Sequence, residues 1–211
     1  MLTRVVFNQK GGVGKSSITV NLAAISAKKG LRTLVIDLDP QANSSQYLLG
    51  EDATYSADKA ALEPNIENFF DDILGTTQQK SLIGNAIGSI LKTPRSKGLD
   101  SYVHRTSFEN LDVIPASPSL GALEHALESK HKIYKLRDSI QSLSARYDRI
   151  FIDTPPAFNF FTLSALISAD RVLIPFDCDV FSKRALQTLI ENVLETQDDH
   201  NDRLEIEGIV V

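Results

Sequence analysis

Short runs of apolar residues recur along the chain, and each is bounded by polar or turn-forming positions. Runs of this length are typical of buried strands in a parallel sheet. The candidates are residues 4–8, 32–37, 111–115, 149–153, 171–175 and 206–211. Because helical patterns separate many of these runs, the sequence predicts an α/β fold: a mostly parallel twisted sheet flanked by helices.

Helical periodicity appears between the predicted strands. Residues 16–29 have helical character and stop at Gly30, a residue that commonly ends helices. Apolar residues spaced three and four apart predict further helices. These stripes are Ile66, Phe69, Phe70, Ile73 and Leu74; Leu82, Ile83, Ala86, Ile87 and Ile90; Ile133, Leu136, Ile140 and Leu143; and Leu186, Leu189, Ile190, Val193 and Leu194. With no internal repeat, residues 1–211 are expected to form a single domain, within which residues 50–110 are a variable helical and loop segment.

The turn after the first predicted strand is rich in glycine and directly precedes a predicted helix. It reads Lys10, Gly11, Gly12, Val13, Gly14, Lys15, Ser16 and Ser17. Glycines let backbone N–H groups turn toward an anion, and a helix N-terminus favours negative charge. In a phosphate-binding loop Lys15 reaches the β- and γ-phosphates, and the Ser16 hydroxyl binds a Mg²⁺ ion. Residues 10–17 are therefore predicted to bind a nucleoside triphosphate.

This loop departs from the usual phosphate-loop pattern at its start. The common pattern begins with glycine five residues before Gly14, where this chain has Gln9. Lys10 adds a second lysine, which an ordinary phosphate loop does not need. Both departures indicate a variant of the loop; the alternative is a glycine-rich turn with a solvated lysine.

Three carboxylates follow predicted strands. Asp37 and Asp39 come at the end of one strand, and Asp153 ends the apolar run 150–152 before Thr154, Pro155 and Pro156. Open α/β sheets bind ligands at the carboxyl ends of their strands. Asp37 or Asp39 could order water or the Mg²⁺ shell, and Asp153 is expected to bind Mg²⁺ as a Walker B acid.

The sequences KGGVGKSS (10–17), DLDPQANSS (37–45) and DTPP (153–156) occur in this order at predicted strand ends. In this they resemble the ParA-type ATPases, which partition chromosomes and plasmids and form part of the ParA/MinD superfamily with a deviant Walker A loop. Residues 21–24, 115–118 and 169–175 extend the similarity, which covers most of the chain outside about 50–110.

The resemblance implies a role for each matching residue. Lys10 is the lysine that reaches across a dimer interface to the partner's nucleotide, Lys15 is the phosphate-loop lysine, and Asp39 positions the attacking water. Ser16 and Asp153 hold Mg²⁺. The resemblance also implies an ATP-dependent sandwich homodimer, DNA binding without sequence preference, and slow hydrolysis stimulated by a ParB-like partner.

The chain departs from the family in several places. Asn159 stands where members usually carry glycine, and since Asn tolerates a left-handed backbone, a turn there should survive. Residues 75–105 look longer than usual. No helix-turn-helix domain precedes the loop, as in the short family members. Because the chain ends in an apolar strand, native C-terminal sequence is expected beyond Val211, with the adenine-binding and main DNA-binding residues in it.

Composition restricts the other readings. A net charge of −5 argues against a surface coated in nucleic acid, which leaves Lys183 and Arg184 as candidates for a local DNA-binding patch. A lone cysteine, Cys178, excludes a disulfide framework and an iron–sulfur relative. No apolar stretch approaches the ~18 residues that cross a bilayer, so a cytoplasmic protein is expected, nucleoid-associated if it binds DNA.

Two rival functions share the deviant loop. One is a membrane-cycling positioning ATPase of the MinD kind, which needs a C-terminal amphipathic helix. The other is a metabolic ligase of the cobyrinate or dethiobiotin type. The DPQ-x-N sequence that begins at Asp39 favours partition over the MinD reading. A nucleotide-binding module without turnover is a third alternative.

Overall fold

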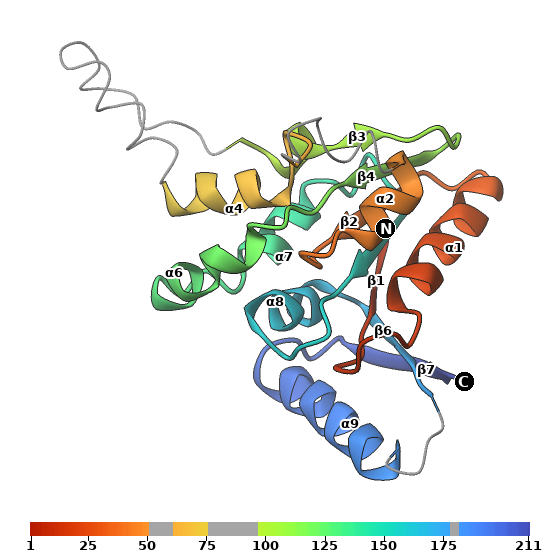
Figure 1. Cartoon of the computed structure of the whole chain (residues 1–211), viewed down its shortest axis with the longest axis vertical. Helices are drawn as coiled ribbons and strands as arrows, with labels where there is room; N and C mark the ends of the chain where they lie inside the picture. Colours follow the sequence, from red (N-terminus) through yellow and green to blue (C-terminus); the bar gives the residue numbers. More distant parts are fainter. Residues whose placement is uncertain (51–60, 76–96, 178–181) are drawn as a thin grey trace.

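A computed structural model describes residues 1–50, 61–75, 97–177 and 182–211 and shows a seven-stranded sheet (Figure 1). Its strand order is β3-β4-β2-β5-β1-β6-β7, and every neighbouring pair is parallel except β3 with β4. The strands are β1 (Leu2–Val6), β2 (Thr33–Asp37), β3 (His104–Arg105), β4 (Leu111–Ile114), β5 (Arg149–Asp153), β6 (Arg171–Pro175) and β7 (Glu205–Val210). The predicted mostly parallel α/β fold is confirmed.

Helices cover both faces of this sheet. They are α1 (Lys15–Lys28), α2 (Asn43–Leu49), α4 (Ile66–Leu74), α6 (Glu124–Ser129), α7 (Lys135–Gln141), α8 (Phe160–Ser168) and α9 (Ser182–Asp199), with 3₁₀ turns η1 (Leu99–Tyr102) and η2 (Leu120–Leu123). Ala23 and Ala27 of α1 and Leu48 of α2 pack on Val35 and Phe151 of the sheet. The other helices cover the opposite face, which holds the larger core.

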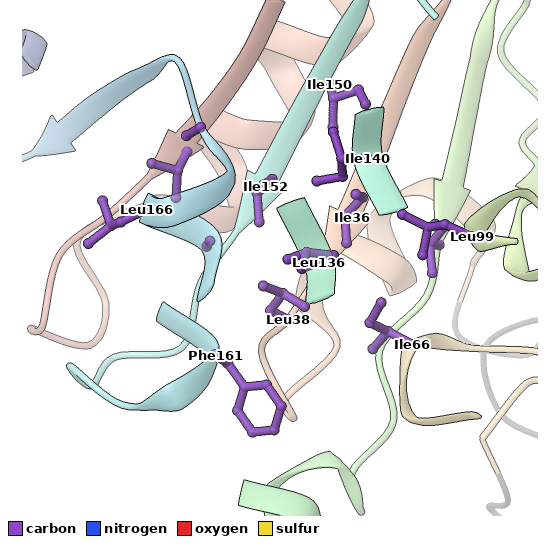
Figure 2. Packing of buried hydrophobic residues seen from close by; sticks show 14 of the residues in the cluster. Ile36, Leu38, Ile66, Leu99, Leu136, Ile140, Ile150, Ile152, Phe161 and Leu166 are labelled. Atoms are coloured by element: carbon purple, nitrogen blue, oxygen red, sulfur yellow. The ribbon is translucent and has the colours of Figure 1, made fainter. Parts of the chain in front are cut away.

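That larger core follows from the alternation of side chains along buried strands. Ile36, Ile150 and Ile152 are fully buried on the face that α7 covers, and Leu136 and Ile140 of α7 meet them (Figure 2). Strands that are buried on both faces read as continuous apolar runs, which explains why the sequence pattern located them well.

Aromatic rings tie the segment around α4 into this core. Phe70 makes edge-on contacts with Phe69, Phe160 and Phe161, at centroid distances of 5.0, 6.1 and 5.6 Å. Tyr102 of η1 lies 5.7 Å from Phe69. Described parts of residues 50–110 therefore contribute to the main core, and α4 confirms the stripe that starts at Ile66. The stripe from Leu82 to Ile90 lies outside the described residues.

The structure differs from the sequence predictions at several local points. The sequence pattern missed the two-residue edge strand β3, because so short a strand has no period to detect. Asn159 has φ −122° and ψ −174°, which is extended backbone, so the expected left-handed turn there is wrong. Its side chain instead accepts a hydrogen bond from the Thr162 N–H at 3.1 Å and caps α8.

The aromatic cluster gives a test of the core. We expect Phe70→Ala to lower the free energy of unfolding by about 3–5 kcal/mol, because it leaves a cavity among packed rings. Phe108→Ala is the matched control: its ring is half exposed, and the change should cost less than about 1 kcal/mol. Urea unfolding followed by circular dichroism measures both, and equal losses would contradict this account of the core.

Candidate functional site

Three neighbouring strands bring the predicted motifs to one edge of the sheet. β5 lies between β2 and β1, and Asp153 is in register with Asp37 on one side and Val6 on the other. The loop that begins after β1, the segment after β2 and the end of β5 therefore meet at the carboxyl edge. This is where open α/β sheets bind their ligands.

Residues 10–17 form a turn that opens directly into α1. Gly12 and Gly14 have φ values of 77° and 84°, in the left-handed region that favours glycine. The first N–H groups of a helix have no partner within the helix, so those at the start of α1 are available to an anion. Asn8 holds the start of the turn, since its Oδ1 accepts from the Lys10 N–H at 2.8 Å and its Nδ2 donates to the Pro175 carbonyl at 2.7 Å.

Lys15 is a buried cation within this turn. Its side-chain ammonium donates to the Lys10 carbonyl oxygen at 3.0 Å, and the residue is only 6% exposed. Burial lowers the pKa of Lys15, while the Asp153 and Asp39 carboxylates oppose that shift. A phosphate placed on the loop would add the anionic partner that keeps this ammonium charged.

Lys10 lies in different surroundings. Its Nζ is 3.3 Å from Oδ2 of Asp177, which follows β6, and half of its side chain is exposed. The two lysines of the loop therefore differ in place as well as in sequence: Lys15 is enclosed and Lys10 lies at the surface. Sequence reasoning did not find Asp177, because only the fold brings the β6 end beside the loop.

Asp153 is fully buried beneath the loop. Its Oδ2 accepts a hydrogen bond from the Ser44 hydroxyl at 2.7 Å, and the Ser16 hydroxyl lies close enough to favour the ionised form of the carboxyl group. Burial raises the pKa of Asp153 to about 6, against the effect of these hydroxyls. The two residues predicted to bind Mg²⁺, Ser16 and Asp153, are thus in contact.

Asp37 and Asp39 lie in different environments, although only one residue, Leu38, separates them in the sequence. Asp37 is fully buried, and burial together with the Asp153 carboxylate raises its pKa to about 8. Asp39 is 6% exposed and lines a cleft, where its Oδ1 accepts from the Gln41 N–H at 3.0 Å. Burial raises the pKa of Asp39, opposed by the Gln41 hydrogen bond and the Lys15 charge.

That cleft has a volume of about 390 Å³, within the range of small-ligand sites. It is lined by Gly11, Gly12, Gly14, Lys15, Ser16, Ser17, Asp39, Gln41, Asn43, Tyr47 and Pro156. The sequence motifs included Gln41 and Asn43 without giving them a role, and Pro156 as part of the turn that could couple the γ-phosphate to conformation. Tyr47 carried no sequence signal; its side chain reaches the cleft because α2 turns back beside the loop.

Two other hollows lie away from these residues. One of about 630 Å³ lies between α1 and the turn before β4, with Lys28 and Glu109 as its charged lining residues. Another of about 370 Å³, at the amino edge of the sheet, includes Arg137, His200 and Arg203. Neither contains a residue of the 10–17 loop, so of these three hollows in the described part of the chain it is the 390 Å³ cleft that would place a triphosphate on that loop.

The residues of the cleft fit Mg²⁺ and a nucleoside triphosphate. A Cβ built on Gly11 or Gly12 would meet no atom within 4 Å, so the space above the loop is open to an anion. Mg²⁺ prefers one or two carboxylates combined with phosphate oxygens and water. Asp153 and Ser16 supply such a partial set, and no group of three His, Cys, Asp or Glu side chains that could hold a metal occurs in the described part of the chain.

A glycine-rich turn between a parallel strand and a helix, with a buried carboxylate at the end of the adjacent strand and a second lysine at its start, is the arrangement of the P-loop fold of the deviant Walker A class. A family model described as an AAA domain matches residues 2–206. The chain belongs to the ParA/Soj family of P-loop ATPases.

Curated relatives align along nearly the whole chain. Chromosome partitioning protein ParA of Myxococcus xanthus is 34% identical over 207 residues, which are 98% of this chain and 62% of the relative. Sporulation initiation inhibitor protein Soj of Bacillus subtilis is 30% identical over 98% of this chain and 70% of its own length. The chain thus spans about two thirds of the length of these relatives.

Solved structures agree with the fold. Cobyrinic acid a,c-diamide synthase from Mycobacterium smegmatis, with bound ADP and magnesium, matches with a TM-score of 0.76 and 24% identity. The match covers 99% of this chain and 72% of that one. At this identity the likeness carries the fold and not the substrate.

The other sequence candidates lie away from the cleft or beyond the described side chains. Arg184 is exposed in the first turn of α9, and the Lys183 side chain lies outside the described part, as does Cys178. Within the ranges that the structure describes, no helix is both long and apolar enough to span a bilayer.

The buried carboxylates predict how stability depends on pH. The folded-state pKa values of Asp37 and Asp153, about 8 and about 6, exceed the unfolded value of about 4. Between about pH 4 and 8 the folded chain therefore binds more protons than the unfolded chain, and stability falls as pH rises. We expect urea unfolding in EDTA without nucleotide to give a lower free energy of unfolding at pH 8 than at pH 5.

Asp37→Asn cannot ionise, so its free energy of unfolding should fall less over the same pH range. Asp148 does not confuse the comparison, because its ion pair with Arg32 lowers its pKa to about 2 and its effect lies below about pH 4. Identical slopes for the variant and the original chain would reject the assignment of the pH dependence to Asp37.

Proposed function

We propose that this chain is a Mg²⁺- and ATP-dependent dimerising switch that serves DNA partition. The observation that carries the proposal is the unequal placement of two lysines on one phosphate loop. Lys15 is buried where a triphosphate would lie, whereas the Lys10 side chain is half exposed at the surface, where it pairs with Asp177. In the proposed switch, the buried lysine binds the nucleotide of its own subunit and the surface lysine binds that of the partner subunit.

The residues divide the work as follows. Backbone N–H groups of residues 10–17 and the Lys15 ammonium bind the phosphates. Ser16 and Asp153 hold Mg²⁺, which when bound neutralises phosphate charge. Asp39 orients the attacking water, and Lys10 leaves Asp177 to reach the nucleotide of the partner subunit. Breaking the exposed Lys10–Asp177 ion pair costs little, since pairs of this kind contribute about 0–1 kcal/mol.

We favour partition over the metabolic ligase because the relatives named for chromosome partition share more sequence with this chain than the cobyrinic acid synthase does. The relatives named for chromosome partition or for Soj reach 30–34% identity over 98% of this chain, whereas the cobyrinic acid synthase shares the fold at 24% identity. We infer that the partner stimulating hydrolysis is ParB-like and that DNA binds without sequence preference, with Lys183 and Arg184 contributing to the contact. The activity and partners of the whole protein belong to this proposal.

Substitution of each lysine tests the proposed division of roles. Lys15→Ala should weaken ATP binding about 30-fold or more, since loss of a desolvated charged partner costs about 2–5 kcal/mol. Lys10→Ala should keep the ATP affinity of the monomer within about twofold and lose the ATP-dependent dimer. Titration calorimetry measures the first effect and light scattering the second.

The matched control is Lys29→Ala, an exposed lysine at the end of α1, which should change neither quantity. A Lys15→Ala variant with unchanged ATP affinity would refute the phosphate-loop role. A Lys10→Ala variant that still dimerises with ATP would refute the role across the interface.

A DNA co-sedimentation assay with ATP, with ADP and without nucleotide tests whether the chain binds DNA in an ATP-dependent way. We expect retention with ATP alone, and a decrease as salt rises, because phosphate contacts release counterions. Asp39→Ala should remain on DNA for longer, since it closes on ATP without hydrolysing it. Retention that is independent of nucleotide would contradict partition, and retention on lipid vesicles instead would favour the MinD-like alternative.

A further inference from the structure

The segment between β2 and α2, residues 38–42, contains one residue with a strained backbone. Ala42, the residue before α2, has φ 55° and ψ 31°. This left-handed conformation is unfavourable for alanine because its Cβ is crowded against the backbone. It is fully buried, and its N–H donates to the Asp39 carbonyl at 2.8 Å while its own carbonyl accepts from the Gln46 N–H at 2.9 Å. Such strain persists only where surrounding contacts hold it, and it often occurs beside functional groups.

The fully buried Asp37 carboxylate supplies those contacts. Oδ1 of Asp37 accepts the Asp39 N–H at 3.1 Å. Its Oδ2 accepts the Ser45 N–H at 2.9 Å and the Ser45 hydroxyl at 2.7 Å. One side chain thus holds both ends of the strained segment, the end that carries Asp39 and the end that begins α2.

Ser45 also connects Asp37 to the segment that follows β4. Besides donating to Asp37, its Oγ accepts the N–H of Ala116, which follows β4, at 3.0 Å. The preceding residue, Ser44, donates its hydroxyl to Asp153 at the end of β5. Adjacent serines in the first turn of α2 therefore tie the carboxyl ends of β4, β2 and β5 together.

We propose that Asp37 and Ser45 are a positioning pair for Asp39: they keep the strained 38–42 segment in place, so that the Asp39 carboxylate faces the cleft in one orientation. The pair acts through Asp39 and touches neither nucleotide nor metal. Asp39 lines the cleft, whereas Asp37 does not and has both oxygens engaged by the donors described above. The inference rests on the proposed role of Asp39 in hydrolysis.

The first experiment uses hydrogen exchange in the protein without nucleotide. Ser45→Ala should speed exchange of the Asp39 and Ser45 N–H groups about tenfold or more, because it removes a link between Asp37 and Ala116. The matched control is Ser164→Ala, which deletes another fully buried hydroxyl, bonded to the Ile133 carbonyl at 3.0 Å in α8. That control should leave exchange in residues 37–45 unchanged.

The second experiment separates positioning from binding. Ser45→Ala should lower kcat for ATP hydrolysis about 10- to 100-fold, as expected for a misplaced catalytic group, and leave KM within about twofold. Ala42→Gly removes the Cβ that is strained at φ 55°, so adding it to Ser45→Ala should restore part of kcat.

Each result decides the proposal. Unchanged exchange and unchanged kcat in a folded Ser45→Ala variant would overturn it, as would a KM that rises by as large a factor as kcat falls. If Ser45→Ala does not fold, Asp37→Asn, which keeps the shape of the side chain, serves in both assays with the same expectations. Because exchange is measured without nucleotide, failure of the positioning pair stays distinct from failure of ATP binding, which calorimetry on the original chain reports.

Discussion

The site depends on keeping two carboxylates buried side by side at the ends of neighbouring strands. Asp37 and Asp153 are in register and both fully buried, an arrangement that costs free energy unless donors compensate. In the first turn of α2, the Ser44 hydroxyl donates a hydrogen bond to Asp153 and the Ser45 hydroxyl donates one to Asp37. The position of α2 is therefore tied to the chemistry of the sheet edge.

This constraint links the phosphate loop to the rest of the fold. Lys15, the cation of the loop, is attracted electrostatically by Asp153 and Asp39, so loop, Walker B strand and α2 share one electrostatic environment. Lys10 stands outside it, paired with Asp177 at the surface. The proposal of an ATP-dependent dimer rests on this contrast between an enclosed lysine and a lysine at the surface.

Local signals in the sequence located most of the fold and part of the site. Buried parallel strands read as apolar runs and were found almost to the residue, as β5 and β6 show. The phosphate loop was readable because glycine conformations, a lysine and a hydroxyl must occur in a fixed order. Edge strand β3 was missed for lack of a period, and Asn159 was misread because a helix cap and a left-handed turn favour the same residue type.

The sequence by itself determined the elements, the phosphate loop and the identity of the carboxylates, because each depends on residues close together along the chain. Only the tertiary structure decided where each carboxylate lies. Asp37 and Asp39 look alike in sequence, yet the strand end directs one into the interior against Ser45 and leaves the other on the cleft. The contacts of Lys10 with Asp177 and of Ser44 with Asp153 join residues more than a hundred positions apart, and such pairings follow from strand order, which no local pattern encodes.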